Sequence, residues 1–222
     1  MRRTEDWTCP RCYKAELEFG DHPFEVSDKV IGEYPGLKCP NCQLVCFDKA
    51  ASRLIMETLM ESEIHPLNSH ELCLLLLYAT DKPIKGATVF MKEIFLLFKE
   101  KLREFDIPAI SPHFISYHYG PYSFDIDEAW RILDELGLIQ IQGKKSSRKE
   151  SFYLTEEGRA KAKRIFDSLP ADLQSDLYDW RRGLDELGRD GILKTVYQDY
   201  DSYTDKSKIK DEVLPKWTHK RA

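Results

Sequence analysis

The chain has 222 residues, of which 42% are hydrophobic, and it carries a formal net charge of −5. This composition supports one good hydrophobic core and a small additional module. The net negative charge argues against a protein that coats nucleic acids non-specifically. Local basic patches are compatible with this charge. No apolar run is long enough to span a bilayer, and the N-terminus lacks the apolar segment of a signal peptide. We therefore expect a cytoplasmic protein without membrane contact.

Four of the six cysteines are arranged in two pairs, Cys9-Pro-Arg-Cys12 and Cys39-Pro-Asn-Cys42. A turn of this kind presents two thiolates on one side, and two such turns complete a tetrahedral shell for zinc. The spacing therefore predicts a structural Zn²⁺ site formed by Cys9, Cys12, Cys39 and Cys42. Four cysteine ligands leave no open coordination position for catalysis. Paired cysteines of this type also indicate metal chemistry in a reducing compartment.

Residues 1–48 are predicted to form a zinc ribbon of short β-strands, because glycine and proline punctuate the apolar residues between the cysteine pairs. So small a module lacks a sufficient core, and metal binding must supply much of its folding free energy, on the order of 10 kcal/mol. His22 or Cys46 could replace one of the ligands, but a surface imidazole and a buried thiol are the simpler interpretation. Cys73 lies in an apolar segment and is interpreted as a small core residue.

Three helices are predicted after the ribbon. The first covers residues 47–64, and the linker that joins the ribbon to the main domain is assigned to residues 49–68. Residues 71–80, capped by Ser69, are apolar around nearly the whole helix circumference, so they should form a central core helix. The segment 87–105 has apolar residues at helical spacing and should bury one side.

A helix, two strands and another helix are predicted next. Apolar residues recur at spacings of three and four between Ser123, a plausible N-cap, and Gly137, which ends the helix. Two short strands, 138–141 and 152–154, flank a polar loop, and Thr155 opens the next helix. This order is that of the second half of a winged helix-turn-helix. The predicted fold class is therefore mainly α with a small β-hairpin, winged-helix-like, behind an N-terminal zinc ribbon.

The C-terminal part is predicted to contain two further helices. They begin at Pro170 and near Ile192 and are separated by a break from Gly188 to Gly191. Residues 207–222 are charged and are predicted to form a mobile tail.

Several segments from Glu71 onward form a family pattern. They are LLLLYA at 74–79, PIKG at 83–86, KEIFL at 92–96, YGPYS at 119–123, LDELGLI at 133–139, YLTEEG at 153–158, and the pairs at 196–197 and 206–207. In these segments the chain resembles the Panacea domain, the SocA-like antitoxin-associated family, over residues 69–206. The resemblance implies a compact helical domain used in toxin neutralisation or related regulation, and it implies no catalytic residues. The cysteine pairs also resemble the zinc module of YgiT/MqsA-type antitoxins.

Two features bear on DNA binding, and they point in different directions. The helix that would enter the major groove carries five acids between Asp125 and Glu135 against one cation, and acids are repelled by phosphates. The loop between the two strands carries four cations, which suit a wing that touches phosphates. These candidate nucleic-acid-binding residues are Lys144, Lys145, Arg148 and Lys149. A solvated hairpin tip that is kept soluble by its charge explains them equally well.

The segment from His113 to Tyr122 is rich in aromatic residues and has no evident nucleophile motif. Tyrosine provides a large contact area at low entropic cost, so Tyr117, Tyr119 and Tyr122 are candidate partner-binding residues. The alternative is that these rings pack the turn before the following helix, with Gly120-Pro121 setting its geometry.

The lead hypothesis is a non-catalytic regulatory protein that resembles an antitoxin and acts by contact with a protein partner such as a toxin. The runner-up is a DNA-binding transcriptional regulator of the winged helix-turn-helix type that uses the basic loop. Both can hold together, because antitoxins often repress their own genes. An enzyme is not expected. A homodimer is compatible with the sequence, which identifies neither a toxin nor an operator.

Overall fold

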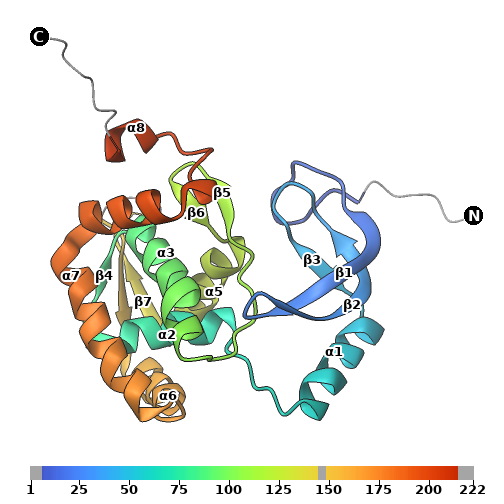
Figure 1. The fold of residues 1–222 in the computed structure, drawn as a ribbon, viewed down its shortest axis with the longest axis horizontal. Coiled ribbons are helices and arrows are strands. Elements are labelled where there is room, and N and C mark those ends of the chain that lie inside the picture. Colours follow the sequence, from blue (N-terminus) through green and yellow to red (C-terminus); the bar gives the residue numbers. More distant parts are fainter. Residues whose placement is uncertain (1–6, 145–148, 215–222) are drawn as a thin grey trace, which may run out of the picture.

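The computed structural model describes residues 7–144 and 149–214. Figure 1 shows two lobes: an N-terminal lobe of strands and one helix, and a larger C-terminal body of helices with small sheets. About half of the described residues are helical, and the sheets among them are small and antiparallel. The predicted combination of helices and small antiparallel sheets is confirmed. No helix in this described part is both long enough and apolar enough to cross a membrane.

The N-terminal lobe is built on a three-stranded sheet in the order β1-β2-β3. β1 (Glu18–Val26) and β2 (Lys29–Lys38) form a hairpin, and β3 (Val45–Phe47) pairs with β2. Ser27 and Asp28 join the hairpin with positive φ, which is the two-residue turn whose twist matches the flanking strands. The hairpin strands span nine and ten residues, so they are longer than the short strands that were predicted.

Helix α1 (Lys49–Glu61) packs onto this sheet and belongs to the N-terminal lobe. Asp48 caps the helix by accepting a hydrogen bond from the N–H of Ala51 at 2.8 Å. The apolar residues recur every four positions, so they form one face. The small core that this face closes consists of Val26, Tyr34, Ala51, Ile55 and Leu59. The predicted linker over 49–68 therefore begins with a helix that is part of the lobe.

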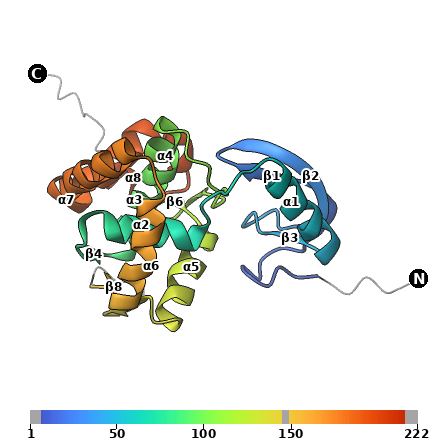
Figure 2. The ribbon, with the colours of Figure 1, turned by 90° about the horizontal axis from the view of Figure 1, so that it is seen from below.

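Helix α2 (Ser69–Thr80) is the central helix of the C-terminal body, as its apolar circumference predicts. Seven of its twelve residues are buried. It packs against α5 (Phe124–Glu135), α6 (Glu156–Asp167) and α7 (Ala171–Asp199), and Figure 2 shows it among these elements of the body. The core of the body thus surrounds a helix that has almost no polar side.

The helix starts follow local capping chemistry. Ser123 and Thr155 cap α5 and α6 as predicted. The cap of α2 is Asn68 rather than the predicted Ser69, because the Asn68 side chain and Glu71 form a reciprocal capping box.

Helix α3 (Ala87–Leu96) continues through a π-helical turn, η1 (Leu97–Lys101), into α4 (Leu102–Glu104). The single helix that was predicted over 87–105 is therefore present but interrupted in its hydrogen-bond pattern. In contrast to α1, α2, α5 and α6, α3 has no side-chain cap.

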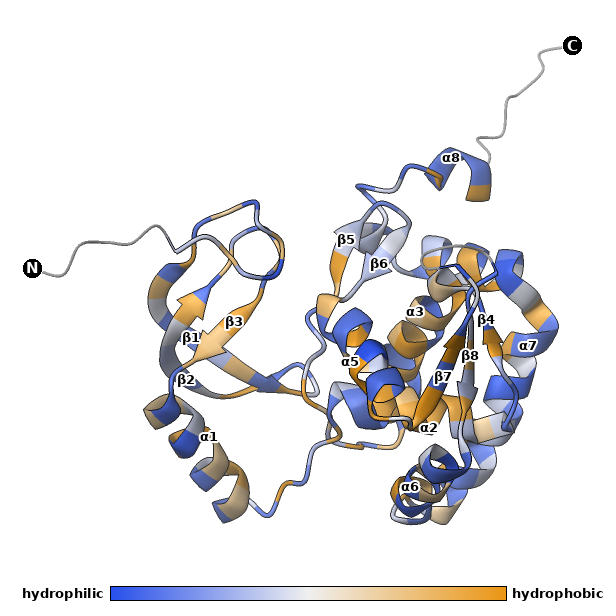
Figure 3. Cartoon of the chain, turned by 180° about the vertical axis from the view of Figure 1, so that it is seen from behind, coloured by the Kyte–Doolittle hydropathy of each residue, from blue (hydrophilic) through white to orange (hydrophobic). Residues whose placement is uncertain are grey.

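The body contains a three-stranded sheet in the order β4-β8-β7. β7 (Ile139–Gln142) and β8 (Ser151–Leu154) form the predicted hairpin, and β4 (Ile84–Lys85), which was not predicted, pairs with β8. In β7 the apolar Ile139 and Ile141 alternate with two glutamines, whereas α6 is mostly hydrophilic (Figure 3). Gly158 of α6 lies so close to the carbonyl oxygen of Leu138 that a Cβ would collide with it, so a glycine is required where α6 meets the sheet.

A second hairpin, β5 (Ile115–Tyr117) and β6 (Gly120–Tyr122), lies in the aromatic segment and was not predicted. Gly120 has a φ of +83°, and a Cβ there would lie 3.0 Å from the ring of Tyr197. Both the backbone conformation and the close approach therefore require glycine at this position.

The long helix α7 contains the predicted break, because Gly188 has non-helical φ and ψ angles of 61° and −176°. The 3₁₀ turn η2 (Asp201–Tyr203) and the short helix α8 (Lys210–Val213) follow.

The described part of the predicted tail, residues 207–214, packs against the body instead of being free. The hydroxyl groups of Ser207 and Tyr197 are hydrogen-bonded at 2.7 Å, and the N–H of Lys208 donates to the carbonyl oxygen of His118 at 2.9 Å. Apolar residues of this segment also contact the core, namely Ile209, Val213 and Leu214. These contacts place the described part of this charged segment against the body.

Candidate metal centre and interaction surfaces

Each cysteine pair lies in a turn of the same backbone geometry. The carbonyl oxygen of Cys9 accepts from the N–H of Tyr13 at 3.0 Å, and that of Cys39 accepts from the N–H of Gln43 at 3.0 Å. Tyr13 and Gln43 both have positive φ. The second turn lies between β2 and β3, so the sheet positions it. The two turns therefore present their thiols from equivalent positions.

The structure brings the four predicted ligands together. The Sγ atoms of Cys9, Cys12, Cys39 and Cys42 all lie within 4.8 Å of one another. The Cys9–Cys42 and Cys12–Cys39 Sγ distances are both 3.6 Å, which is far too long for a disulfide. Sulfur atoms of a tetrahedral zinc site lie about 3.8 Å apart when the Zn–S bonds are about 2.3 Å. The four cysteines can therefore hold a metal ion.

The surroundings of the thiols differ across the cluster. Burial opposes ionisation of Cys12, but hydrogen bonds from the Lys14 backbone and the Asn41 side chain outweigh it and lower the pKa to about 6. Burial raises the pKa of Cys42. Cys9, Cys39 and Cys42 are almost fully buried, so the cluster combines one thiol that ionises readily with a shielded interior.

The other candidate ligands lie outside this cluster. The His22 ring is within 3.4 Å of the carbonyl oxygen of Glu18. Cys46 is half-buried in β3, and burial raises the pKa of its thiol. Cys73 is fully buried in α2, where burial likewise raises the thiol pKa. The geometry of the described residues thus favours roles other than metal ligation for His22, Cys46 and Cys73.

The first cysteine turn also contacts the helical body. Arg11, between Cys9 and Cys12, forms ion pairs with Asp125 at 2.7 Å and with Glu128 at 3.1 Å, both on α5. His113 lies 2.8 Å from the other oxygen of Asp125. Burial opposes ionisation of Asp125, but His113 and Arg11 outweigh it and lower the pKa of this carboxyl. Sequence reasoning missed this contact, because Arg11 and α5 are more than a hundred residues apart.

The turn of the β1–β2 hairpin forms a second contact between the lobes. The N–H of Ser27 donates to the carbonyl oxygen of Ala109 at 2.7 Å, and Asp28 pairs with Lys99 at 3.1 Å and also with Arg103. The N-terminal lobe is therefore attached to the body at two places, at a cysteine turn and at a hairpin turn.

Two of the candidate nucleic-acid-binding residues lie in the described part of the β7–β8 connection. Lys144 and Lys149 are exposed there. Lys145 and Arg148 lie outside the described residues. On α5, three of the acids form ion pairs: Asp127 pairs with Arg131 at 3.0 Å, and Asp125 and Glu128 pair with Arg11.

The three candidate partner-binding tyrosines line one cavity, but they differ in exposure. Tyr119 is 51% exposed. Tyr117 and Tyr122 are half-buried and pack on each other and on Phe124. Burial, with Asp127 as the next contribution, raises the pKa of Tyr122. Packing of the segment therefore accounts for Tyr117 and Tyr122, and Tyr119 has the free surface.

Three charged side chains are buried beneath the surface of α3 and α7. Lys92, Glu93 and Arg181 are each at most 2% exposed. Arg181 lies 3.3 Å from Glu93 and 2.5 Å from Asp185. Burial raises the pKa of Glu93 to about 8, although Arg181 opposes this effect. Charged residues inside the apolar pattern of 87–105 were the sequence feature that could have identified Lys92 and Glu93.

A comparison of the chain with protein-family models, curated proteins and solved structures finds no match. Fold and site define a two-lobed chain, about half helical, with a four-cysteine group that can hold a metal ion. The resemblance to Panacea-domain proteins and to antitoxin zinc modules stays a prediction.

Proposed function

We propose that the chain is a non-catalytic regulatory protein that binds another protein and uses a structural zinc ion to fold its N-terminal lobe. Toxin neutralisation is the role that the resemblance to Panacea-domain antitoxins implies. The observation that carries the proposal is the number of large apolar side chains exposed on the N-terminal lobe, next to a metal centre with no ligand position left for chemistry.

Zinc is the metal that this donor set favours. Four thiolates at tetrahedral spacing suit zinc, and such a site stabilises a fold without an open coordination position. The lobe supports this assignment, because its own apolar core contains only five buried residues besides the cysteines. A core of this size needs metal binding for independent stability.

Large apolar side chains are unevenly exposed over the described residues. Seven of the eleven that are exposed belong to the N-terminal lobe. They are Trp7, Tyr13, Phe19, Val30, Leu54, Met56 and Met60. Phe19 is 80% and Met60 69% exposed. Exposed apolar residues in such number on a small module are typical of a surface that a protein partner covers.

Co-expression with the product of the neighbouring gene tests this function. We expect the two chains to purify as a complex and the growth inhibition caused by a toxin-like neighbour to be relieved. Phe19→Asp and Met60→Asp should each weaken the complex about tenfold or more, because a charge would replace a buried apolar contact. Isothermal titration calorimetry measures the change in affinity.

The matched control is Leu136→Asp, since Leu136 is 61% exposed but lies on the body. Equal losses for Leu136→Asp and Phe19→Asp, or a neighbour that neither binds nor affects growth, would contradict the proposal. A second copy of the chain as partner would be recognised by light scattering, as a doubled mass that Phe19→Asp abolishes.

DNA binding is the second candidate, and two observations favour it. The element order α2-β4-α3-η1-α4-β5-β6-α5-β7-β8, in which the β5–β6 hairpin is inserted before α5, and the sheet order β4-β8-β7 support the winged-helix interpretation, and Lys144 and Lys149 are exposed at the wing tip. The acidic α5, which the N-terminal lobe contacts through Arg11, disfavours use of this helix as the reading element. DNA contact would then depend on the wing.

Fluorescence anisotropy with random and upstream duplexes over a salt series tests this candidate. If the wing binds phosphates, alanine at positions 144, 145, 148 and 149 should reduce the salt slope by about 3 to 4. Alanine at the exposed Lys29, Lys49 and Lys161, which lie elsewhere, should change it little. Salt-independent binding, or equal effects of both variants, would reject the wing as the DNA contact.

A further inference from the structure

The Cys9–Cys12 turn lies outside the strands of the N-terminal lobe. The N–H of Cys9 donates to the carbonyl oxygen of Ala15 at 2.8 Å, and the N–H of Tyr13 donates to that of Cys9 at 3.0 Å. Both bonds connect residues of one short segment, so they do not tie this segment to the sheet. A metal ion shared with the second cysteine turn would do so, because that turn lies between β2 and β3.

Arg11, inside the first cysteine turn, reaches the start of α5 in the body. Its Nη2 atom lies 2.7 Å from one oxygen of Asp125 and 3.1 Å from one oxygen of Glu128. The arginine side chain is only 16% exposed, and His113 lies 2.8 Å from the other oxygen of Asp125. Partly buried ion pairs are screened less than exposed ones, so the contact between the lobes depends on where the turn places Arg11.

Phe124, the first residue of α5, adds an apolar contact beside these ion pairs. Its side chain packs against the buried cysteine cluster. The centroid of its ring also lies 6.0 Å from that of Tyr117 and 5.0 Å from that of Tyr122. The start of α5 therefore contacts the four-cysteine centre and its turn through both charge and apolar packing.

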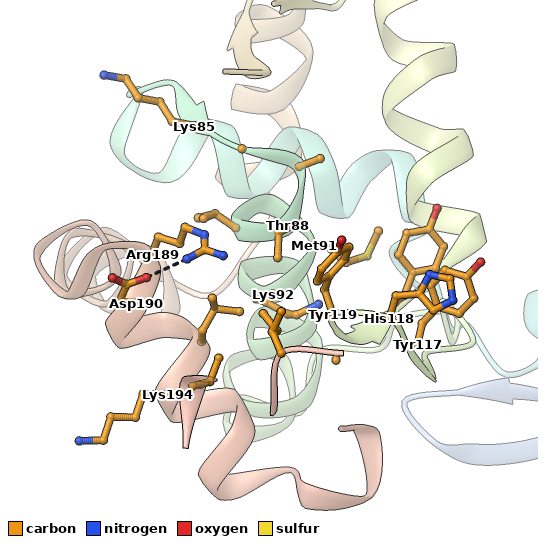
Figure 4. A pocket seen from close by; sticks show the side chains of 18 of the residues that line it. Lys85, Thr88, Met91, Lys92, Tyr117, His118, Tyr119, Arg189, Asp190 and Lys194 are labelled. Carbon is orange, nitrogen blue, oxygen red and sulfur yellow. Dashed lines mark hydrogen bonds and ion pairs between the residues drawn. The ribbon is translucent and has the colours of Figure 1, made fainter. Parts of the chain in front are cut away.

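The two tyrosines connect this contact to a cavity of about 900 Å³ in the body. The cavity lies between α3, the β5–β6 hairpin, the second half of α7 and α8, and the C-terminal segment 207–214 contributes to its wall. Figure 4 shows Tyr117, His118 and Tyr119 together on one side of the cavity. Phe124 thus connects the cysteine cluster to the hairpin that carries the candidate partner-binding tyrosines.

We propose that the start of α5 is the docking surface for the metal-loaded Cys9–Cys12 turn, so that metal occupancy controls whether this helix is covered. This control rests on the metal assignment of the proposed function and adds a form of regulation to it. With metal bound, the N-terminal lobe covers Phe124, Asp125 and Glu128. Without metal, the turn loses its fixed position and the start of α5 becomes accessible.

Thermodynamic linkage makes this control reciprocal. If the bound metal favours docking, docking must favour metal binding by the same factor, which for coupled sites is about 5- to 150-fold. Asp125 and Glu128 do not belong to the four-cysteine cluster. Neutralising them should nevertheless weaken metal binding, because a lobe that docks poorly leaves the cysteine turn less ordered.

Asp125→Asn combined with Glu128→Gln tests this coupling, since it removes both charges and keeps the side-chain shapes. We expect the zinc affinity of the full chain, measured by competition with a chromophoric chelator, to fall about fivefold or more. Direct electrostatics predicts the opposite sign, because the removal of two nearby carboxylates favours the thiolates around Zn²⁺. Unchanged or tighter zinc binding would therefore overturn the proposal.

The matched control is Glu156→Gln combined with Glu157→Gln, which makes the same charge change in the first turn of α6. Both glutamates are exposed, and zinc affinity should stay within about twofold of the wild-type value. In an Arg11→Gln background, the α5 double variant should likewise change zinc affinity by less than about twofold, because its partner is already absent. An equal loss from the α6 pair, or a full additional loss in the Arg11→Gln background, would contradict docking through Arg11.

Hydroxyl-radical footprinting with mass spectrometry measures whether α5 is covered. Oxidation of Phe124 should be slow in the zinc-loaded wild-type chain and faster after chelation, and in the α5 double variant it should be faster even with zinc bound. Tyr178, which is 50% exposed on α7, serves as the internal reference, and circular dichroism confirms that each variant is folded.

Protection of Phe124 that does not depend on zinc would overturn the control of docking and leave the zinc assignment intact. A wild-type chain that binds no zinc would overturn both.

Discussion

Replacing Cys39 by serine is expected to abolish metal binding and to unfold the N-terminal lobe while the helical body stays folded. Cys39 is fully buried, and its Sγ lies 3.6 Å from that of Cys12, so its loss opens the coordination shell. Structural zinc contributes about 10 kcal/mol to the folding of such modules, far more than the small core of this lobe can replace. Elemental analysis should fall from one zinc per chain to near zero, and amide exchange should become fast over residues 7–47.

Cys46→Ser is the matched control, because Cys46 lies in the same lobe but outside the ligand cluster. It should retain one zinc per chain and the protected amides. A full complement of zinc in Cys39→Ser, or a lobe that stays protected after chelation, would contradict the metal assignment. Fast exchange that spreads through α2 would show that the lobes do not fold independently.

Arg181→Met is expected to lower the free energy of unfolding of the body by about 3 to 5 kcal/mol above about pH 8, where Glu93 is ionised, because it then leaves a buried charged acid without its partner. Arg181 is 1% exposed and contacts Glu93 and Asp185. Methionine fills much of the same volume, so the loss reports the charge rather than a cavity. Urea denaturation followed by circular dichroism measures the difference.

Arg182→Met changes the neighbouring arginine, which is 53% exposed in its side chain and pairs with exposed acids on α7. Such surface pairs contribute about 0 to 1 kcal/mol. The free energy of unfolding of Arg182→Met should therefore stay close to that of the wild-type chain. Similar losses for Arg181→Met and Arg182→Met would show that the buried pair is not what stabilises this region.

The same pair determines a pH dependence with a definite sign. Burial raises the pKa of Glu93 from 4.5 to about 8, against the opposing effect of Arg181. The folded state therefore binds the Glu93 proton more tightly than the unfolded state does, so this contribution to stability is complete below pH 4.5 and is lost as pH rises towards 8. Glu93→Gln, which mimics the protonated side chain, should flatten this part of the stability profile. An unchanged slope would place the titration on another group.

Most helices of this chain were predictable because their patterns are local. The apolar circumference of α2, the caps Ser123 and Thr155, and the break at Gly188 each depend on residues within a few positions of one another. The strands β4, β5 and β6 were missed, since two or three residues carry no periodicity of their own. Their partners in the sheet, not their sequences, make them strands.

The candidate sites likewise include one that the local sequence predicts and others that depend on contacts between distant residues. The four-cysteine cluster was predictable, because each pair lies within one turn and a tetrahedral metal site takes four thiols. The attachment of Arg11 to α5, and the cavity that α3, α7 and the C-terminal segment share, could not be predicted. Nothing in the sequence near Arg11 or Ile209 indicates which distant residues each one meets.

By itself the amino-acid sequence determined a four-cysteine module, a central apolar helix and a helix followed by a β-hairpin, since these follow from spacing along the chain. Only the tertiary structure decided that Arg11 meets Asp125, that Glu93 is buried beside Arg181, and that residues 207–214 close a cavity. The reason is physical: capping, periodicity and metal-ligand spacing act over a few residues. Burial and charge pairing depend on which surfaces come together when the whole chain has folded.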